Sequence, residues 1–296
     1  MSETAAGSPA RTGRSLAGIG LMLGGIFLFS VNDALGKWLV STYSIGQLLL
    51  VRSSAALVVL APVIWREGLG AFRFAPRPGL QALRVAFATL EVACFYAAVA
   101  YLPLADVMTY YLAGPILVVG LSVLFLGERT ERRRMAVVGI GFVGVLIALQ
   151  PSESTLTWPA LIALAGTLFF ALLMITTRQL KGTSGTVLVA AQTIGALMLG
   201  AVMAPFGWVA PSWLDLGLLA LLGVVAMAAN VCVNHSLRLA PASVVAPFQY
   251  TLIVWAVALG WLVFGDVPGA ATLIGAAIIV GAGVLLLLQE RGEARS

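Results

Sequence analysis

The chain is dominated by apolar stretches of about 20 residues, and these constrain its fold more than any other feature. A helix rises about 1.5 Å per residue, so such a stretch crosses the roughly 30 Å hydrocarbon core of a bilayer. Ten stretches occur, at approximately residues 16–40, 45–65, 79–101, 104–126, 134–150, 157–179, 186–206, 213–237, 241–263 and 269–289. We therefore predict an all-α integral membrane protein with ten transmembrane helices.

Composition supports the same prediction. Charged residues make up 10% of the chain and hydrophobic residues 60%, and the mean hydropathy is +1.03. Soluble domains carry about 25% charged residues, so a water-soluble fold could not bury this much apolar surface. Cys94 and Cys232 both lie inside apolar stretches without the spacing of metal ligands, so we expect no disulfide, metal site or other cofactor.

The positions of the basic residues predict the orientation of the chain. An even number of spans puts both termini on one side of the membrane. Of the 17 Lys and Arg residues, 14 fall in the tails and connectors of that side, and Lys37 alone lies at an outer end. The positive-inside rule therefore predicts cytoplasmic tails at residues 1–15 and 290–296, in a bacterial-type inner membrane. The net charge of +5 reflects these connectors and indicates no nucleic-acid partner.

The two halves of the chain resemble each other at an offset of about 140 residues. Gly144–Gln150 ends the fifth stretch and matches Gly283–Gln289, which ends the tenth. The chain thus divides into repeats of five helices each, at residues 16–150 and 157–289. Because five is odd, the second copy must enter the membrane from the opposite face. Inverted repeats of this kind are typical of transporters, whose substrate site lies near the midplane where the repeats meet.

One motif also carries a family resemblance. Pro115–Glu128, followed by a glycine-rich stretch, resembles the EamA module of the drug/metabolite transporter superfamily. The pattern recurs at Ile253–Asp266, where Ile253 replaces the proline and Asp266 replaces the glutamate. The resemblance covers nearly the whole chain, whose general character is similar to amino-acid exporters of the YddG type. It implies ten helices around a central cavity and export of small metabolites without a nucleotide-binding domain.

Charged residues inside the apolar stretches are candidates for a site. Asp33, Arg52 and Glu91 all fall in the predicted outer half of the membrane, where an isolated charge is costly and a paired one is tolerated. We predict that Arg52 neutralises Glu91, Asp33 or both, and that Asn32 or Ser30 adds hydrogen bonds. The cluster has two interpretations, a cavity wall or gate for a zwitterionic substrate and a structural ion pair. A local pair between Asp33 and Lys37, one turn apart, is a further alternative.

The second repeat differs from the first in its polar residues. The positions aligned with Asp33, Arg52 and Glu91 carry neutral residues, Met174, Gln192 and Ala228. Other polar residues fall in the predicted inner half of the membrane: Asn230, Asn234, Gln249 and Tyr250. Asn230 and Asn234 are spaced i, i+4 and share a helix face. These side chains either form hydrogen bonds between helices or line the cavity.

Aromatic residues at membrane depth suggest an apolar pocket. Tyr96 lies on the third stretch, and Tyr110 and Tyr111 lie on the fourth. Rings at this depth can line a site for an apolar side chain, and we expect Tyr110 or Tyr111 to face the cavity.

Three further residues have mainly structural interpretations. Arg84 lies near the predicted cytoplasmic end of its stretch, and we expect it to extend its charge to the interface. Pro115 and Pro247 lie inside stretches, where each can produce a static kink or act as a hinge.

These features predict a secondary transporter that exports small metabolites across the inner membrane by alternating access. Amino acids, in particular aromatic or apolar ones, are the favoured substrate class. The alternative is a carrier of the same fold that expels drugs or other metabolites. A membrane enzyme is disfavoured because we find no catalytic motif, and a channel is disfavoured by the inverted repeat. The expected partners are a small molecule and the lipid bilayer; the oligomeric state is left open, and a monomer is compatible with the sequence.

Overall fold

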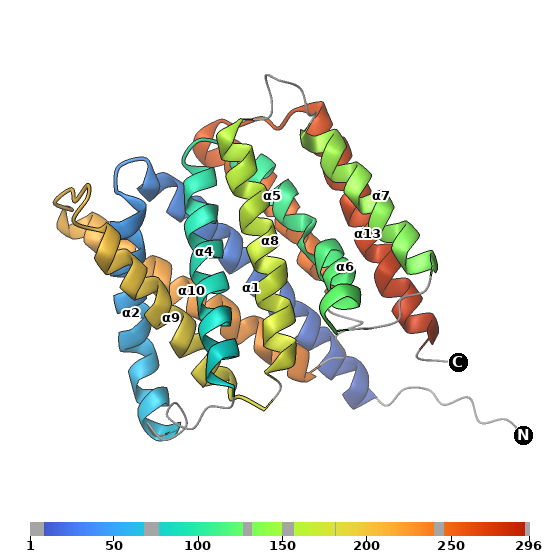
Figure 1. Cartoon of the computed structure of the whole chain (residues 1–296), viewed down its shortest axis with the longest axis horizontal. Coiled ribbons are helices and arrows are strands. Elements are labelled where there is room, and N and C mark those ends of the chain that lie inside the picture. The colour runs from blue at the N-terminus through green and yellow to red at the C-terminus, as the bar shows by residue number, and fades with distance from the viewer. Residues whose placement is uncertain are drawn as a thin grey trace, which may run out of the picture.

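Helices make up nearly all of the computed structural model, which describes residues 9–67, 77–126, 132–149, 157–180, 182–239 and 246–293 (Figure 1). The first half contains α1 Pro9–Val40, α2 Ile45–Glu67, α4 Pro78–Val99, α5 Leu104–Leu112, α6 Gly114–Leu126 and α7 Arg132–Leu149. The second half contains α8 Trp158–Gln179, α9 Gly185–Met203, α10 Trp213–Leu239, η1 Ala246–Tyr250, α12 Thr251–Leu259, η2 Gly260–Phe264 and α13 Ala270–Glu293.

These elements correspond to the ten predicted spans. Within the described ranges, six helices are each long and apolar enough to cross a membrane, and four shorter apolar helical segments supply the remaining spans. The fourth span consists of α5 and α6, and the ninth consists of η1, α12 and η2. The predicted all-α membrane fold with ten spans is confirmed. Helices α1 and α13 continue beyond their apolar stretches into the predicted tails.

Helix packing follows an inverted two-fold symmetry. Figure 1 shows α1 running away from the end of the bundle where α13 finishes, and α8 running in the opposite direction. We call that end the terminal end and the opposite one the far end. The packing of α1 on α10 is matched by α4 on α8, and α2 on α10 is matched by α4 on α9. The equivalent helices α2 and α9 pack on each other, as do α7 and α13. The two repeats are therefore interlocked and share one interface.

The fourth span is broken by its sequence. Pro115 has no N–H group, so it cannot complete the helical hydrogen bond to the Tyr111 carbonyl. Ala113 forms a turn instead, and its N–H donates to the Tyr110 carbonyl at 3.0 Å. Gly114 lies against Phe170, whose ring would come within 2.7 Å of a Cβ atom at this position. The break thus brings α5 and α6 close to α8.

Pro247 likewise lies in an irregular segment, the 3₁₀ turn η1 that opens the ninth span. The side chains of Pro115 and Pro247 are outside the described part of the chain. Both prolines therefore occur where a span departs from regular α-helix, and their role as hinges stays a prediction.

The far end of the bundle is closed by a core from both repeats. Its buried apolar residues include Leu39, Leu48, Leu49, Val99, Leu104, Leu219 and Leu222. Tyr43 donates a hydrogen bond to Asp215 Oδ2 at 2.7 Å, which ties the α1–α2 connector to α10. Lys37 Nζ pairs with Asp266 Oδ2 at 2.5 Å, so the suggested local pair of Lys37 with Asp33 is wrong. The ion pair instead joins the first repeat to the second across the far end.

Candidate functional site

A cavity of about 790 Å³ lies between the two repeats. It is lined by side chains of α1, α2, α4, α5 and α6 from the first repeat and of α8, α9, α10, η1 and α12 from the second. Thr177 and Arg178, in the last turn of α8, are among the lining residues, so the cavity reaches the terminal end while the core closes the far end. Pockets of 300–1,000 Å³ typically hold drug-sized ligands, so the cavity has the size of a binding site for a small metabolite.

Most of the residues singled out from the sequence lie on this cavity. The lining includes Asn32, Asp33, Arg52, Glu91, Tyr96, Tyr111, Asn230, Gln249 and Tyr250. Tyr110 is only 7% exposed and packs in the core of the far end, so Tyr111 is the tyrosine of that pair that reaches the cavity. The side chain of Asn234 is outside the described part of the structure.

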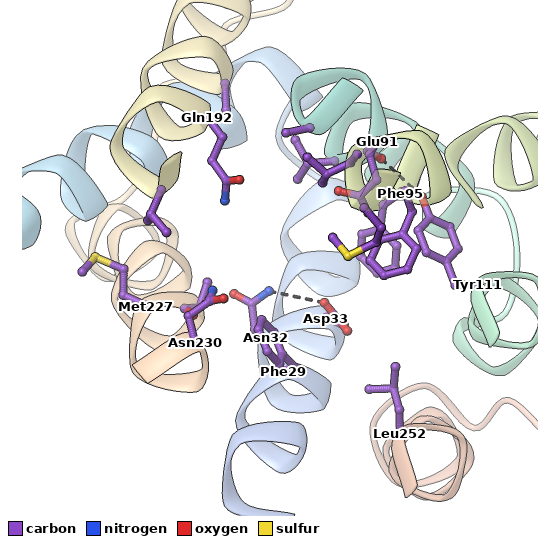
Figure 2. A pocket seen from close by; sticks show the side chains of 18 of the residues that line it. Phe29, Asn32, Asp33, Glu91, Phe95, Tyr111, Gln192, Met227, Asn230 and Leu252 are labelled. Atoms are coloured by element: carbon purple, nitrogen blue, oxygen red, sulfur yellow. Dashed lines mark hydrogen bonds between the residues drawn. The ribbon is translucent and has the colours of Figure 1, made fainter. Parts of the chain in front are cut away.

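Three residues of the first repeat with side-chain acceptors line the cavity, and we call Asn32, Asp33 and Glu91 the acceptor wall. Figure 2 shows Asn32 and Asp33 next to each other on α1, and Glu91 farther along the wall, beside Phe95. Asn32 Nδ2 donates to Asp33 Oδ1 at 3.3 Å, which confirms the predicted hydrogen bond. Asn32 is 4% exposed, and within the described ranges no group donates a hydrogen bond to its Oδ1 atom. Among the described residues, no Lys, Arg or His nitrogen lies within 4 Å of the Asp33 or Glu91 carboxylate. The carboxylates of the wall therefore have spare acceptor positions for a donor that comes from outside the chain.

The predicted ion pairs of Arg52 are wrong. Arg52 Nη1 donates to Tyr96 Oη at 2.6 Å, and the guanidinium carbon lies 5.3 Å from the centre of the Tyr96 ring. Tyr96 is 1% exposed and offers a buried oxygen and a ring face close to Arg52, so the guanidinium is held there. Arg52 still interacts electrostatically with Asp33 and Glu91 over a longer distance.

Aromatic rings form the part of the cavity next to Glu91. Phe95 makes edge-to-face contacts with Tyr96 and Tyr111, with ring centres 5.3 and 5.6 Å apart. The Tyr111 hydroxyl donates to the Glu91 backbone carbonyl at 3.2 Å, so the polar atom of this ring is satisfied. These contacts fix the rings, whose faces and edges can hold an apolar group.

The opposite side of the cavity carries neutral amides from the second repeat. Figure 2 shows Gln192 on α9 and Asn230 on α10, across from Glu91 and Phe95. Asn230 Nδ2 donates to the Ala226 carbonyl of its own helix at 2.9 Å, and the described contacts of Asn230 include no hydrogen bond to another helix. Of the two interpretations of Asn230, lining the cavity therefore agrees better with the structure.

The expectation that Arg84 extends to the membrane interface is wrong. Arg84 is 6% exposed and donates three hydrogen bonds, to Thr177 Oγ1 at 2.8 Å, the Leu188 carbonyl at 3.0 Å and Gln192 Oε1 at 3.1 Å. Acceptors from α8 and α9 therefore hold the side chain inside the bundle. Gln192 and Thr177 were missed as site residues. The one signal for Gln192 in the sequence was its alignment with Arg52.

Comparison with known proteins agrees with this architecture. A sequence model of the EamA-like transporter family matches residues 16–150 and 157–289. One crystal structure aligns with a TM-score of 0.64 at 19% identity, over 93% of this chain and 98% of the other, which shows a shared fold.

Similar sequences include three kinds of transporter. The pseudopaline exporter CntI of Pseudomonas aeruginosa is 29% identical over 273 residues, 90% of this chain and 94% of that one. The riboflavin transporter of Rhizobium johnstonii is 27% identical over 93% of this chain and 92% of its own length. The S-adenosylmethionine uptake transporter of Rickettsia felis is 23% identical over 93% of this chain and 94% of its own length.

None of these three is named as an amino-acid exporter, so that narrower similarity stays a prediction. The matches support a multi-pass membrane protein that transports small metabolites. With a family match over almost the entire length, ten helical spans and a cavity shared by the two repeats, the chain belongs to the EamA-like transporter family.

Proposed function

We propose that this protein is a secondary carrier that exports an amino acid or an amino-acid-derived metabolite by alternating access. The observation that carries the proposal is the acceptor wall. An unpaired buried acceptor costs about 1–3 kcal/mol, and Asn32 Oδ1 is such an atom, on the side chain next to Asp33. A substrate ammonium group beside α1 would donate to the Asp33 carboxylate and to Asn32 Oδ1, which would offset this cost, and the Glu91 carboxylate would attract it over a longer distance.

The rest of the cavity suits the remaining parts of such a substrate. Gln192 lies across the cavity from Glu91, at a position that suits the carboxylate of an amino acid (Figure 2). Phe95 and Tyr111 offer an apolar surface beside it. The volume of about 790 Å³ leaves room for a large side chain or a conjugated group.

Two observations support export as the direction. The positive-inside bias of the sequence predicts that the terminal end is cytoplasmic, and the cavity reaches that end while the far end is closed. In this conformation a substrate would load from the cytoplasm. The similar pseudopaline exporter is named for the same direction, although the S-adenosylmethionine relative is named for uptake.

A second candidate is efflux or transport of a flat aromatic metabolite or a drug. The observation in its favour is the edge-to-face group of Phe95, Tyr96 and Tyr111 on the cavity. The similar riboflavin transporter is named for a substrate other than an amino acid.

Counterflow in proteoliposomes separates the two candidates. The purified protein is reconstituted, and uptake of radiolabelled amino acids, riboflavin and a cationic dye is followed with and without a matching internal substrate and a pH gradient. We expect saturable counterflow of at least one amino acid with a large apolar side chain. Flux of riboflavin or dye without counterflow of any amino acid would contradict the proposal in favour of the second candidate. Protein-free liposomes and the Asp33→Asn variant serve as controls.

A further inference from the structure

Arg84 lies behind the cavity rather than on its surface. The three hydrogen bonds of its guanidinium join α4 to α8 and α9, and two of its acceptors, Thr177 and Gln192, line the cavity. The third acceptor is the Leu188 carbonyl, one turn before Gln192 on α9. Arg84 therefore supports the part of the wall that Gln192 presents.

The chemistry of arginine fixes the orientation of the Gln192 amide. A guanidinium has five N–H donors and no acceptor, so only the oxygen of Gln192 can face Arg84. The contact of Nη2 with Oε1 at 3.1 Å has this orientation. The Nε2 amino group consequently remains for the cavity, into which the Gln192 side chain projects (Figure 2). A free amide could present either its oxygen or its nitrogen, whereas this one presents a donor.

We propose that Arg84 is a positioning residue that makes Gln192 a donor for the acceptor end of the substrate, a carboxylate in the simplest case. The proposal rests on the proposed function, because it names the residue that would bind the end of the substrate opposite its ammonium group. Gln192 aligns with Arg52, so the second helix of each repeat places a hydrogen-bond donor at the cavity. The two repeats thus differ in how the donor is made: the first uses a charge and the second uses an oriented amide.

A competition experiment tests the donor role. Counterflow of radiolabelled L-phenylalanine is measured in proteoliposomes, with phenethylamine as competitor, which has the same ring and ammonium but no carboxylate. We expect Gln192→Ala to lower the apparent affinity for L-phenylalanine about tenfold, which is the effect of losing one hydrogen bond to a charged group. The inhibition constant of phenethylamine should stay unchanged. A loss that is equal for both compounds would overturn the donor role.

Two variants of Arg84 test positioning against a purely structural role. Arg84→Met removes the donors, so we expect the same selective loss as in Gln192→Ala, whereas Arg84→Lys, which keeps a donor, restores most of the preference. In the double variant Arg84→Met/Gln192→Ala the effects on apparent affinity should not add. Additive effects, or a lowered maximal rate with unchanged discrimination between the two compounds, would overturn the proposal.

A measurement without substrate keeps the proposal testable if L-phenylalanine is not transported. Gln192→Cys is made in a background of Cys94→Ala and Cys232→Ala, and we expect a membrane-impermeant thiosulfonate to label it, because the proposal requires position 192 to be open to the cavity. We also expect Gln192→Ala to lower the Tm of the substrate-free protein less in an Arg84→Met background than in the wild type, because the two residues share one hydrogen bond. No labelling, or additive losses of Tm, would overturn the proposal. Failure of wild-type counterflow with every amino acid would instead contradict the proposed function.

Discussion

The two repeats build walls of different chemistry on one symmetric scaffold. The first repeat lines the cavity with Asp33, Arg52 and Glu91, whereas the second lines its interior with the neutral amides of Gln192 and Asn230 and carries Arg178 only at the terminal end. The helix pairs that pack together are related by the inverted symmetry. Alternating access requires symmetry of the backbone, which leaves the side chains free to diverge. We infer that the first repeat contributes most of the binding energy and that the second contributes orientation and selectivity.

The largest effect is expected from the carboxylates of the acceptor wall. Asp33→Asn and Glu91→Gln keep the size of each side chain and remove a charge that would face the substrate ammonium. Loss of one partner of a buried charge pair costs about 2 kcal/mol or more, so we expect the KM for counterflow to rise at least about 30-fold.

The matched control for these carboxylates lies at the aligned position of the second repeat. Met174→Leu changes a cavity residue that aligns with Asp33 and should alter the KM less than about twofold, in line with a volume-conserving swap. Similar effects in both repeats would contradict the inferred division of roles.

Asn32 is expected to give the next largest effect, with a distinctive signature. Asn32→Leu removes the unpaired Oδ1 atom, so we expect about a tenfold rise in KM from the lost hydrogen bond to the ammonium. The variant also loses the hydrogen bond from Nδ2 to Asp33 Oδ1, but removal of the unfavourable unpaired atom offsets that loss, so the substrate-free protein should keep its Tm in detergent. A lowered Tm with an unchanged KM would show that Asn32 serves the fold and not the substrate.

Removal of the Tyr96 hydroxyl should have a moderate effect. Tyr96→Phe deletes the acceptor that holds Arg52 at 2.6 Å, and the released guanidinium can move toward Asp33 and Glu91 and compete with the substrate ammonium. We expect a rise in KM of about threefold to fivefold, comparable to one net hydrogen bond. Tyr110→Phe, in the core, is the control and should leave the KM unchanged; equal effects of the two would argue against release of Arg52.

The smallest effect is expected at Asn230. Asn230→Ala removes a neutral amide that already bonds to the Ala226 carbonyl of its own helix. We expect the KM to rise no more than about threefold, and initial counterflow rates over a range of substrate concentrations will measure it. An effect as large as that of Asp33→Asn would mean that the two repeats contribute equally to substrate binding, which would contradict the inferred division of roles.

The apolar stretches and the odd number of helices per repeat are local properties of the sequence, so the spans and the inverted symmetry could be predicted. Partners across helices could not. The prediction that Arg84 reaches the interface rested only on its distance from the end of its helix. That distance takes no account of the acceptors on α8 and α9 that hold the side chain inside the bundle. The partner of Lys37 is Asp266, in the other repeat.

The direction in which side chains point from the broken fourth span could not be predicted from the sequence either. Adjacent residues on a helix point about 100° apart, so Tyr110 and Tyr111 could not both face the cavity, and only the packing of α5 shows that Tyr111 does. The identity of Tyr96 as the partner of Arg52 likewise depends on side-chain positions within the folded bundle.

Recognition of an ammonium group by the acceptor wall is the central claim, and one comparison tests it directly. The amino acid that gives the fastest counterflow is set against its analogue that lacks only the amino group, as competitors in wild-type proteoliposomes. The account predicts an inhibition constant at least about 30-fold higher for the analogue, and loss of most of this difference in Asp33→Asn. Equal inhibition by both compounds in the wild type would contradict it.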